Sequence, residues 1–204
     1  PALTPSQRMA KRAFDLATAS LILLTILPVL AVIALAIKLD SKGPVLFKQV
    51  RVGENGKMFK MYKFRSMVVN AEQMQATINK VDADGNTLHK FRDDPRVTRV
   101  GRFIRKTSLD ELPQFFNVIT GDMSLVGPRP ELPWLVENYE PWQRQRFSVP
   151  QGITGWWQVN GRSDLPCHLN TDQDLYYIQN YSFMLDIQIL LKTVPALLKG
   201  KGAF

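Results

Sequence analysis

The sequence predicts a predominantly helical α+β fold attached to a membrane. Three observations support this class. Residues 16–37 form an uncharged apolar segment, residues 45–65 alternate as a pair of strands, and the second half of the chain shows amphipathic helical patterns that end at 185–198. We expect two parts: a re-entrant helix-break-helix in the membrane over residues 11–39, and a domain over residues 40–204 that lies on the membrane face through interfacial amphipathic helices.

Composition excludes several classes of protein. With 45% apolar and 22% charged residues, the chain has the balance of a folded domain rather than a disordered one. Cys167 is the single cysteine, which excludes a disulfide framework and a cysteine-based zinc site. His89 and His168 are too few for a histidine-rich metal site. The first residue is not methionine, so we expect a processed product or a fragment of a longer protein.

The net charge of +8 lies entirely at the N-terminal end. Residues 1–66 hold 11 basic and three acidic residues, whereas the remainder of the chain is neutral. Because this excess flanks the apolar segment, it favours contact with an anionic membrane surface and argues against nucleic acid as a partner.

The apolar segment has three interpretations. Its 22 residues could just cross a hydrocarbon core of roughly 30 Å as a single anchor. A cleaved signal peptide fits poorly because no small-residue cleavage site precedes Lys38. Pro28 near the middle, after Leu27, favours a re-entrant segment that turns there and leaves by the same face. Basic residues on both flanks agree with that topology, because a spanning helix concentrates them on one side.

After a turn at Gly43-Pro44, strands are predicted at 45–52 and 58–65, joined through Asn55-Gly56. Alternation would place Lys63 and Arg65 on one face of the second strand. A helix is expected at 68–80 and a polar surface excursion at 81–98.

The rest of the chain reads as helices and loops. A short basic helix at 99–106 should turn Val100, Phe103 and Ile104 inward, and a second helix should run from about 108 to 119, before Gly121. Further expectations are a helical stretch around 132–146, a binding loop at 150–162, a helix near 172–180 and the amphipathic helix 185–198. That last helix lies either at the membrane interface or against the core.

Asp110 and Glu111 open the central helix. Ser108 and Glu111 have the spacing of a capping box, which needs no catalysis. Pro113 argues against that register and favours Asp110 as the N-cap, since proline is tolerated in the first turn. An ionised Asp among several Arg and Lys side chains is also a candidate nucleophile or metal ligand for a phosphate substrate.

Five motifs resemble the bacterial sugar transferase family, the monotopic phosphoglycosyl transferases. They are GPVLFKQVRVG at 43–53, YKFRSM at 62–67, SLDELPQ at 108–114, GDMSLVGPRP at 121–130 and GITGW at 152–156. The resemblance runs from about residue 11 to the end of the chain. It also implies the re-entrant helix, although Leu27 stands where many relatives have Ser.

The resemblance implies a two-step reaction. Asp110 would attack the β-phosphorus of a UDP-sugar, release UMP and pass the sugar phosphate to a polyprenyl phosphate, undecaprenyl phosphate being expected. Glu111 would assist, and Asp110 and Glu111 would hold Mg²⁺. The expected place is the cytoplasmic face of a bacterial inner membrane, in exopolysaccharide, capsule or O-antigen synthesis. Glucose or galactose is favoured over N-acetylated sugars, and a homo-oligomer is left open.

Five further residues are predicted to bind substrate, and all but Arg105 have a structural alternative. Lys63 matches a family position, as does Arg105, while Arg65 shares the strand face of Lys63. These two strand residues could instead be solvated charges. Arg129 lies between two prolines that hold its backbone rigid, which suits a phosphate contact or a simple turn. Asp186 matches a family carboxylate or caps the last helix.

Other residues are assigned more weakly. Asp174 is a similar but weaker candidate than Asp186. Trp156 and Trp157 are expected in the core or at the membrane interface, with a uridine stack as the alternative. The stretch from Val149 to Gly152 lacks the basic residue that the family usually carries there, which puts a nucleotide contact in doubt. The competing class is a non-catalytic module that docks on anionic lipid.

Overall fold

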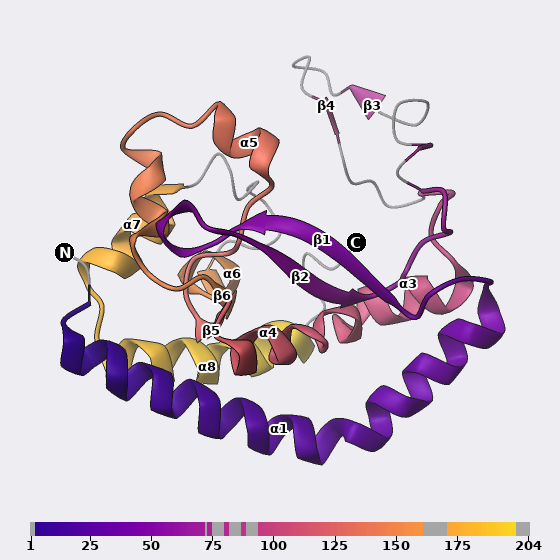
Figure 1. Cartoon of the computed structure of the whole chain (residues 1–204), viewed down its shortest axis with the longest axis horizontal. Coiled ribbons are helices and arrows are strands. Elements are labelled where there is room, and N and C mark those ends of the chain that lie inside the picture. The colour runs from indigo at the N-terminus through magenta and orange to yellow at the C-terminus, as the bar shows by residue number, and fades with distance from the viewer. Residues whose placement is uncertain are drawn as a thin grey trace.

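The computed structural model describes residues 3–71, 73–74, 80–81, 87–88, 94–160 and 171–198, and it confirms a mostly helical α+β fold (Figure 1). Its longest element, α1 (Pro5–Asp40), lies below the rest of the molecule in this view. Thr4 caps α1 in a capping box with Gln7. The helix is long and apolar enough to cross a membrane.

The expected break at Pro28 is a bend within one continuous helix. Assignment as helix runs through Pro28 to Asp40, and Figure 1 shows α1 curving so that both of its ends rise toward the rest of the chain. Proline removes one helix hydrogen bond and crowds the preceding turn, which bends a helix without unwinding its neighbours.

The predicted hairpin is confirmed. β1 (Leu46–Val52) pairs antiparallel with β2 (Met58–Phe64), from Leu46 opposite Phe64 to Val52 opposite Met58. The connection contains η1 (Glu54–Gly56), in which Asn55 and Gly56 both have positive φ. This left-handed geometry is the reason why an Asn-Gly pair marks the turn.

Short helices follow the hairpin. α3 (Arg99–Lys106) is confirmed, with Ile104 buried, but Phe103 is 61% exposed rather than turned inward. The predicted helix at 108–119 is divided into η2 (Leu109–Glu111) and α4 (Gln114–Thr120), which ends at Gly121 in the left-handed conformation.

In the segment expected as a helix at 68–80, the described residues 68–71 and 73–74 form no helix, and residues 72 and 75–79 lie outside the description. Strands β3 (Lys80–Val81) and β4 (Thr87–Leu88) form an antiparallel pair.

A third strand pair was not predicted from the sequence. β5 (Ser124–Val126) runs parallel to β6 (Gly152–Thr154), so the expected binding loop begins as a strand and continues as α6 (Trp156–Asn160). The helical stretch expected at 132–146 is two pieces, α5 (Pro133–Glu137) and η3 (Gln143–Ser148), with Pro141 between them. The predicted helices near the end are α7 (Thr171–Gln179) and α8 (Phe183–Leu198).

Two apolar clusters hold these elements on α1. Around Ala19, the N-terminal half of α1 packs with β2, α4, β5, α7 and α8. Leu23 and Ile37 belong to the second cluster, where α1 meets Phe64 and Ile104 of the hairpin and α3. The buried residues of α1 recur at helical spacing along one face. The hairpin, α4 and α1 are therefore stacked, with α4 in contact with both.

Candidate active site

Asp110 and Glu111 lie in η2, in the tight connection between α3 and α4. The capping-box alternative is wrong, because Ser108 has φ 57° and makes no side-chain cap bond. Pro113 is itself the N-cap residue of α4, so both carboxylates precede that helix. A serine in the left-handed region is strained, and such strain is common where a fold must hold a functional group in place.

Glu111 is held between two cations. Its Oε1 accepts from Lys63 Nζ at 2.9 Å and from Arg129 Nη2 at 2.5 Å, and its Oε2 is 3.4 Å from Arg129 Nη1. Lys63 comes from β2, and Arg129 from the loop after β5. The three side chains are 15–19% exposed, so solvent still reaches them. The structure thus gathers residues from three separate sequence motifs.

The pKa values of the two carboxylates shift in opposite directions, although the neighbouring cations lower both. Burial raises the pKa of Asp110; Lys63 opposes that shift, and the adjacent Glu111 adds to it. Burial would also raise the pKa of Glu111, but Arg129 and Lys63 hold it well below its ordinary value. Burial lowers the pKa of Lys63. Arg105 also acts on Asp110 and favours its ionised form. The ionised form is therefore favoured at Glu111 and disfavoured at Asp110.

Asn117, which the sequence reading missed, holds the hairpin against α4. This buried side chain accepts from Tyr62 N at 2.9 Å and donates to Lys60 O at 2.8 Å. It thereby fixes β2, and with it Lys63, relative to the turn that carries Asp110. The signal was an Asn within an apolar helix face, where a buried amide needs partners.

Arg65 is not part of this group. Its guanidinium donates to Lys42 O at 2.5 Å and to Ser41 O at 2.8 Å, at the C-terminal end of α1. Arg65 lies one residue beyond β2, where its backbone N still donates to Val45 O at 2.8 Å, and its side chain meets different partners from those of Lys63. Arg65 holds the end of the long helix instead.

Asp186 lies in a separate buried network. Its carboxylate accepts from Lys11 Nζ at 2.6 Å and from Tyr177 Oη at 2.7 Å. It does not cap α8, since Ser182 accepts from Leu185 N. Asp186 therefore joins α8 to α1. We call Lys11, Asp186 and Tyr177 the anchor group.

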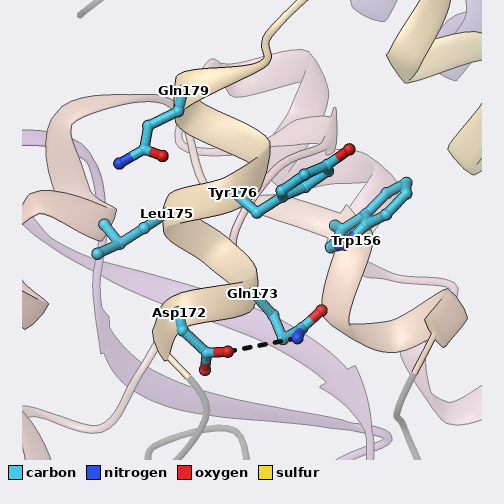
Figure 2. Close-up of a pocket in the computed structure, with 6 residues that line it drawn as sticks. All are labelled: Trp156, Asp172, Gln173, Leu175, Tyr176 and Gln179. Carbon is cyan, nitrogen blue, oxygen red and sulfur yellow. Dashed lines mark hydrogen bonds between the residues drawn. The ribbon is translucent and has the colours of Figure 1, made fainter.

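We call Asp110 and Glu111 the dyad. Two surface hollows in the described part of the chain lie away from the dyad. Figure 2 shows one on α6 and α7, about 440 Å³ in volume, where Trp156 stacks on Tyr176 with ring centroids 4.8 Å apart. The other, about 510 Å³, lies between the hairpin turn and the α5–η3 segment. Neither is lined by Asp110 or Glu111. Trp157 is buried, as expected, and Trp156 carries Lys192 above its ring.

Magnesium fits the chemistry of the dyad with one condition. Among the residues described, no group of three or more His, Cys, Asp or Glu side chains could hold a metal. Mg²⁺ commonly takes one or two carboxylates and completes its shell with substrate phosphates and water. Asp110 offers such an oxygen. Glu111 can offer one only when a phosphate takes over part of its bonding to Lys63 and Arg129.

Comparison with known proteins gives consistent matches. A family described as bacterial sugar transferase matches residues 6–200. The chain is 42% identical over 98% of its length to a UDP-galactose-lipid carrier transferase of Erwinia amylovora, of which it covers 42%. It is 44% identical over 99% of its length to the UDP-glucose:undecaprenyl-phosphate glucose-1-phosphate transferase of Escherichia coli K12, of which it covers 43%.

A third relative is shorter. The chain is 37% identical over its whole length to the exopolysaccharide production protein ExoY of Rhizobium meliloti, of which it covers 92%. The chain thus spans about two fifths of the first two relatives and most of the third.

Proposed function

The chain belongs to the bacterial sugar transferase family, as its motifs predicted, and from that premise we propose that it transfers a hexose 1-phosphate from a UDP-sugar to a polyprenyl phosphate. The observation that carries the proposal is the arrangement of Asp110 beside Glu111 with Lys63, Arg105 and Arg129 around them. The name of the Escherichia coli relative supports undecaprenyl phosphate as the acceptor and glucose as the sugar, and the name of the Erwinia amylovora relative supports galactose and a lipid carrier.

The reaction proceeds in two displacements at one phosphorus atom. An ionised Asp110 oxygen attacks the β-phosphorus, and the bond to the bridging oxygen breaks so that this oxygen leaves with UMP. A phosphate oxygen of the polyprenyl phosphate then attacks the same phosphorus and releases the Asp110 carboxylate. Lys63 and Arg105 favour the ionised form that the first attack needs.

The cations around Glu111 supply the electrostatic part of the reaction. A diphosphate repels an anionic nucleophile unless its charge is balanced. Arg129 and Lys63 are held near Asp110 by Glu111, and both can transfer hydrogen bonds from that carboxylate to phosphate oxygens. Glu111 therefore keeps two mobile cationic side chains in place before the substrate arrives.

Magnesium is part of the proposal. Asp110 would hold it, with Glu111 joining once phosphate has displaced its cationic partners. The bound ion would supply additional neutralisation of the diphosphate charge.

We place the chain on the cytoplasmic face of a bacterial inner membrane, with α1 entering and leaving by that face. The support comes from how both ends of α1 are fastened. Lys11 pairs with Asp186, and Arg12 donates to the last carbonyls of α4. At the other end, Asp40 accepts from Val100 N, and Arg65 holds the C-terminal residues.

A spanning helix would separate these two ends by the thickness of the bilayer. Both halves of α1 also pack into apolar clusters with the other helices and strands. A spanning α1 would have to break the packing of one of these halves. Large apolar side chains meanwhile point outward along the middle of α1, including Leu21, Leu24 and Val32, each more than 60% exposed. This outward surface suits lipid.

The activity is tested by UMP release from UDP-glucose and UDP-galactose, with detergent-solubilised protein, undecaprenyl phosphate and Mg²⁺. The proposal expects UMP release and a lipid-linked sugar diphosphate. Lipid binding without UMP release from either sugar nucleotide would favour the docking module instead.

Topology is tested with single cysteines in place of Arg8 and Lys42, in a Cys167→Ser background. We expect a membrane-impermeant thiol reagent to label both from the cytoplasmic side. Labelling from opposite sides would establish a spanning helix.

A further inference from the structure

Arg146 of η3 is completely buried although it carries a charge. Its Nη2 lies 2.6 Å from Asp174 Oδ2, and Asp174 of α7 is 1% exposed. Removing two charges from water is costly, and a buried ion pair often stabilises a fold no better than apolar residues of the same volume. The orientation that this pair gives to the guanidinium is therefore its main structural consequence.

The guanidinium of Arg146 reaches the loop that carries Arg129. Its Nη2 donates to the Arg129 carbonyl oxygen at 3.0 Å, and its Nη1 donates to Tyr139 Oη at 2.6 Å. The rings of Tyr139 and Phe147 lie within 6 Å of the guanidinium carbon. Its Nη1 also lies 3.7 Å from Glu131 Oε2, so contacts with Asp174, Glu131, Tyr139 and Arg129 fix the orientation of this planar group.

The backbone on either side of Arg129 is held in the same manner. Pro128 O accepts from Gly152 N at 2.8 Å, and Pro130 O accepts from Arg51 Nη1 at 3.2 Å. Three consecutive carbonyls therefore each receive a donor from a different element: β6, η3 and β1. The flanking prolines further limit the backbone. A side chain that leaves such a backbone starts from a fixed point.

We call the contacts that hold the carbonyls of residues 128–130 the clamp. The Arg129 side chain connects the clamp with the dyad, because Arg129 Nη2 lies 2.5 Å from Glu111 Oε1. We propose that Arg146, held by Asp174, is a positioning residue that aims Arg129 at the phosphate site. This inference rests on the proposed function. A displacement of about 1 Å in a positioned group can cost about 10²-fold in rate. A contact to the Arg129 backbone can therefore affect the rate as much as a contact between the Arg129 side chain and the phosphate.

A double-mutant cycle separates positioning from general support of the fold. Arg146→Lys keeps the positive charge but loses the planar guanidinium with its several N–H donors. Asp174→Asn keeps the shape of the side chain but loses its charge, and Tyr139→Phe removes one hydroxyl group. Each is made in the wild-type chain and in Arg129→Ala, with kcat and KM for UMP release and Tm measured. Asp172→Asn, alone and with Arg129→Ala, provides the matched controls, because Asp172 is exposed and lies two residues from Asp174 on α7.

We expect Asp174→Asn and Arg146→Lys to lower kcat/KM by up to about 10²-fold in the wild-type chain. In the Arg129→Ala background the same changes should cost less than about 2-fold, because the side chain being aimed is gone. Each control should stay near its parent chain. Equal losses in both backgrounds, or no loss in the wild-type chain, would overturn the proposal. If Arg146→Lys does not fold, Asp174→Asn and Tyr139→Phe decide the outcome.

A second measurement does not depend on the reaction. Arg129→Cys in a Cys167→Ser background is labelled with a small thiol reagent, with and without Asp174→Asn. We expect several-fold faster labelling when Asp174 is changed and no acceleration with Asp172→Asn. An unchanged labelling rate would show that Asp174 does not restrict residue 129, and it would overturn the proposal. Absence of UMP release by the wild-type chain, with accelerated labelling, would instead count against the proposed function alone.

Discussion

Two lysine–carboxylate pairs in this molecule have nearly the same chemistry and very different surroundings. Lys63 and Glu111 are 2.9 Å apart and about one-sixth exposed, whereas Lys11 and Asp186 of the anchor group are 2.6 Å apart and at most 3% exposed. The first pair can exchange its partners for a phosphate that arrives from solvent. The second cannot, so it serves as a fastening between α1 and α8. Under the proposed function, burial rather than residue type separates the pair that binds substrate from the pair that holds the fold.

The strongest test of this contrast is to remove one carboxylate from each region. Asp110→Asn should abolish UMP release, by about 10³-fold or more, because an amide cannot form the acyl phosphate. Its Tm should stay near that of the wild type. Asp186→Asn should instead lower Tm, since it leaves the ammonium of Lys11 buried with weaker compensation. Substantial turnover by Asp110→Asn would move the nucleophile to another residue.

The two lysines sharpen the comparison. Lys11→Ala should destabilise the protein by about 3–5 kcal/mol, because it leaves a buried carboxylate without its partner. Lys63→Ala should cost about 1 kcal/mol in stability. Its kcat/KM should fall by about 10²-fold, as expected when one group that stabilises developing charge is lost. Denaturant unfolding and UMP release measure the two effects, and the reverse pattern would contradict the assignment of the pairs.

A pH profile tests how Glu111 acts on Asp110. Since burial and the Glu111 charge both raise the pKa of Asp110, kcat/KM should decline on acidification at a higher pH than an ordinary aspartate would give. Glu111→Gln removes that charge and releases Lys63 and Arg129 from it, and both changes favour ionised Asp110. The acidic limb should therefore move to lower pH, with reduced maximal activity. A limb that stays in place would show that another group controls it.

The smallest expected effect concerns stability and pH in the anchor group. Burial raises the pKa of Asp186 above its ordinary value of 3.8, although Lys11 and Tyr177 oppose the shift. The folded chain then binds the proton more tightly than the unfolded chain, so the contribution of Asp186 to stability is full below pH 3.8. It declines as pH rises through the folded pKa. Asp186→Asn should flatten this part of the dependence of Tm on pH, and an unchanged slope would assign it to other groups.

The sequence by itself determined the local features. Asn55-Gly56 fixed the hairpin turn because few residues accept positive φ, and Gly121 ended α4 for the same reason. The apolar spacing in α8 defined a helix without any partner. Five motifs, the one around Asp110-Glu111 among them, predicted the family that the comparison confirmed. These features depend on residues close together in the chain.

Only the tertiary structure decided which charges meet. Lys11 and Asp186 are 175 residues apart, and neither neighbourhood indicates the other. Lys63 and Arg65 look equivalent along the chain, yet one joins Glu111 and the other holds the end of α1. Arg146 and Asp174 carry no local sign of burial. The sequence pattern around a charged residue does not predict whether its side chain is buried or which partner it meets. Its role depends on the solvent and the partners that tertiary packing places around it.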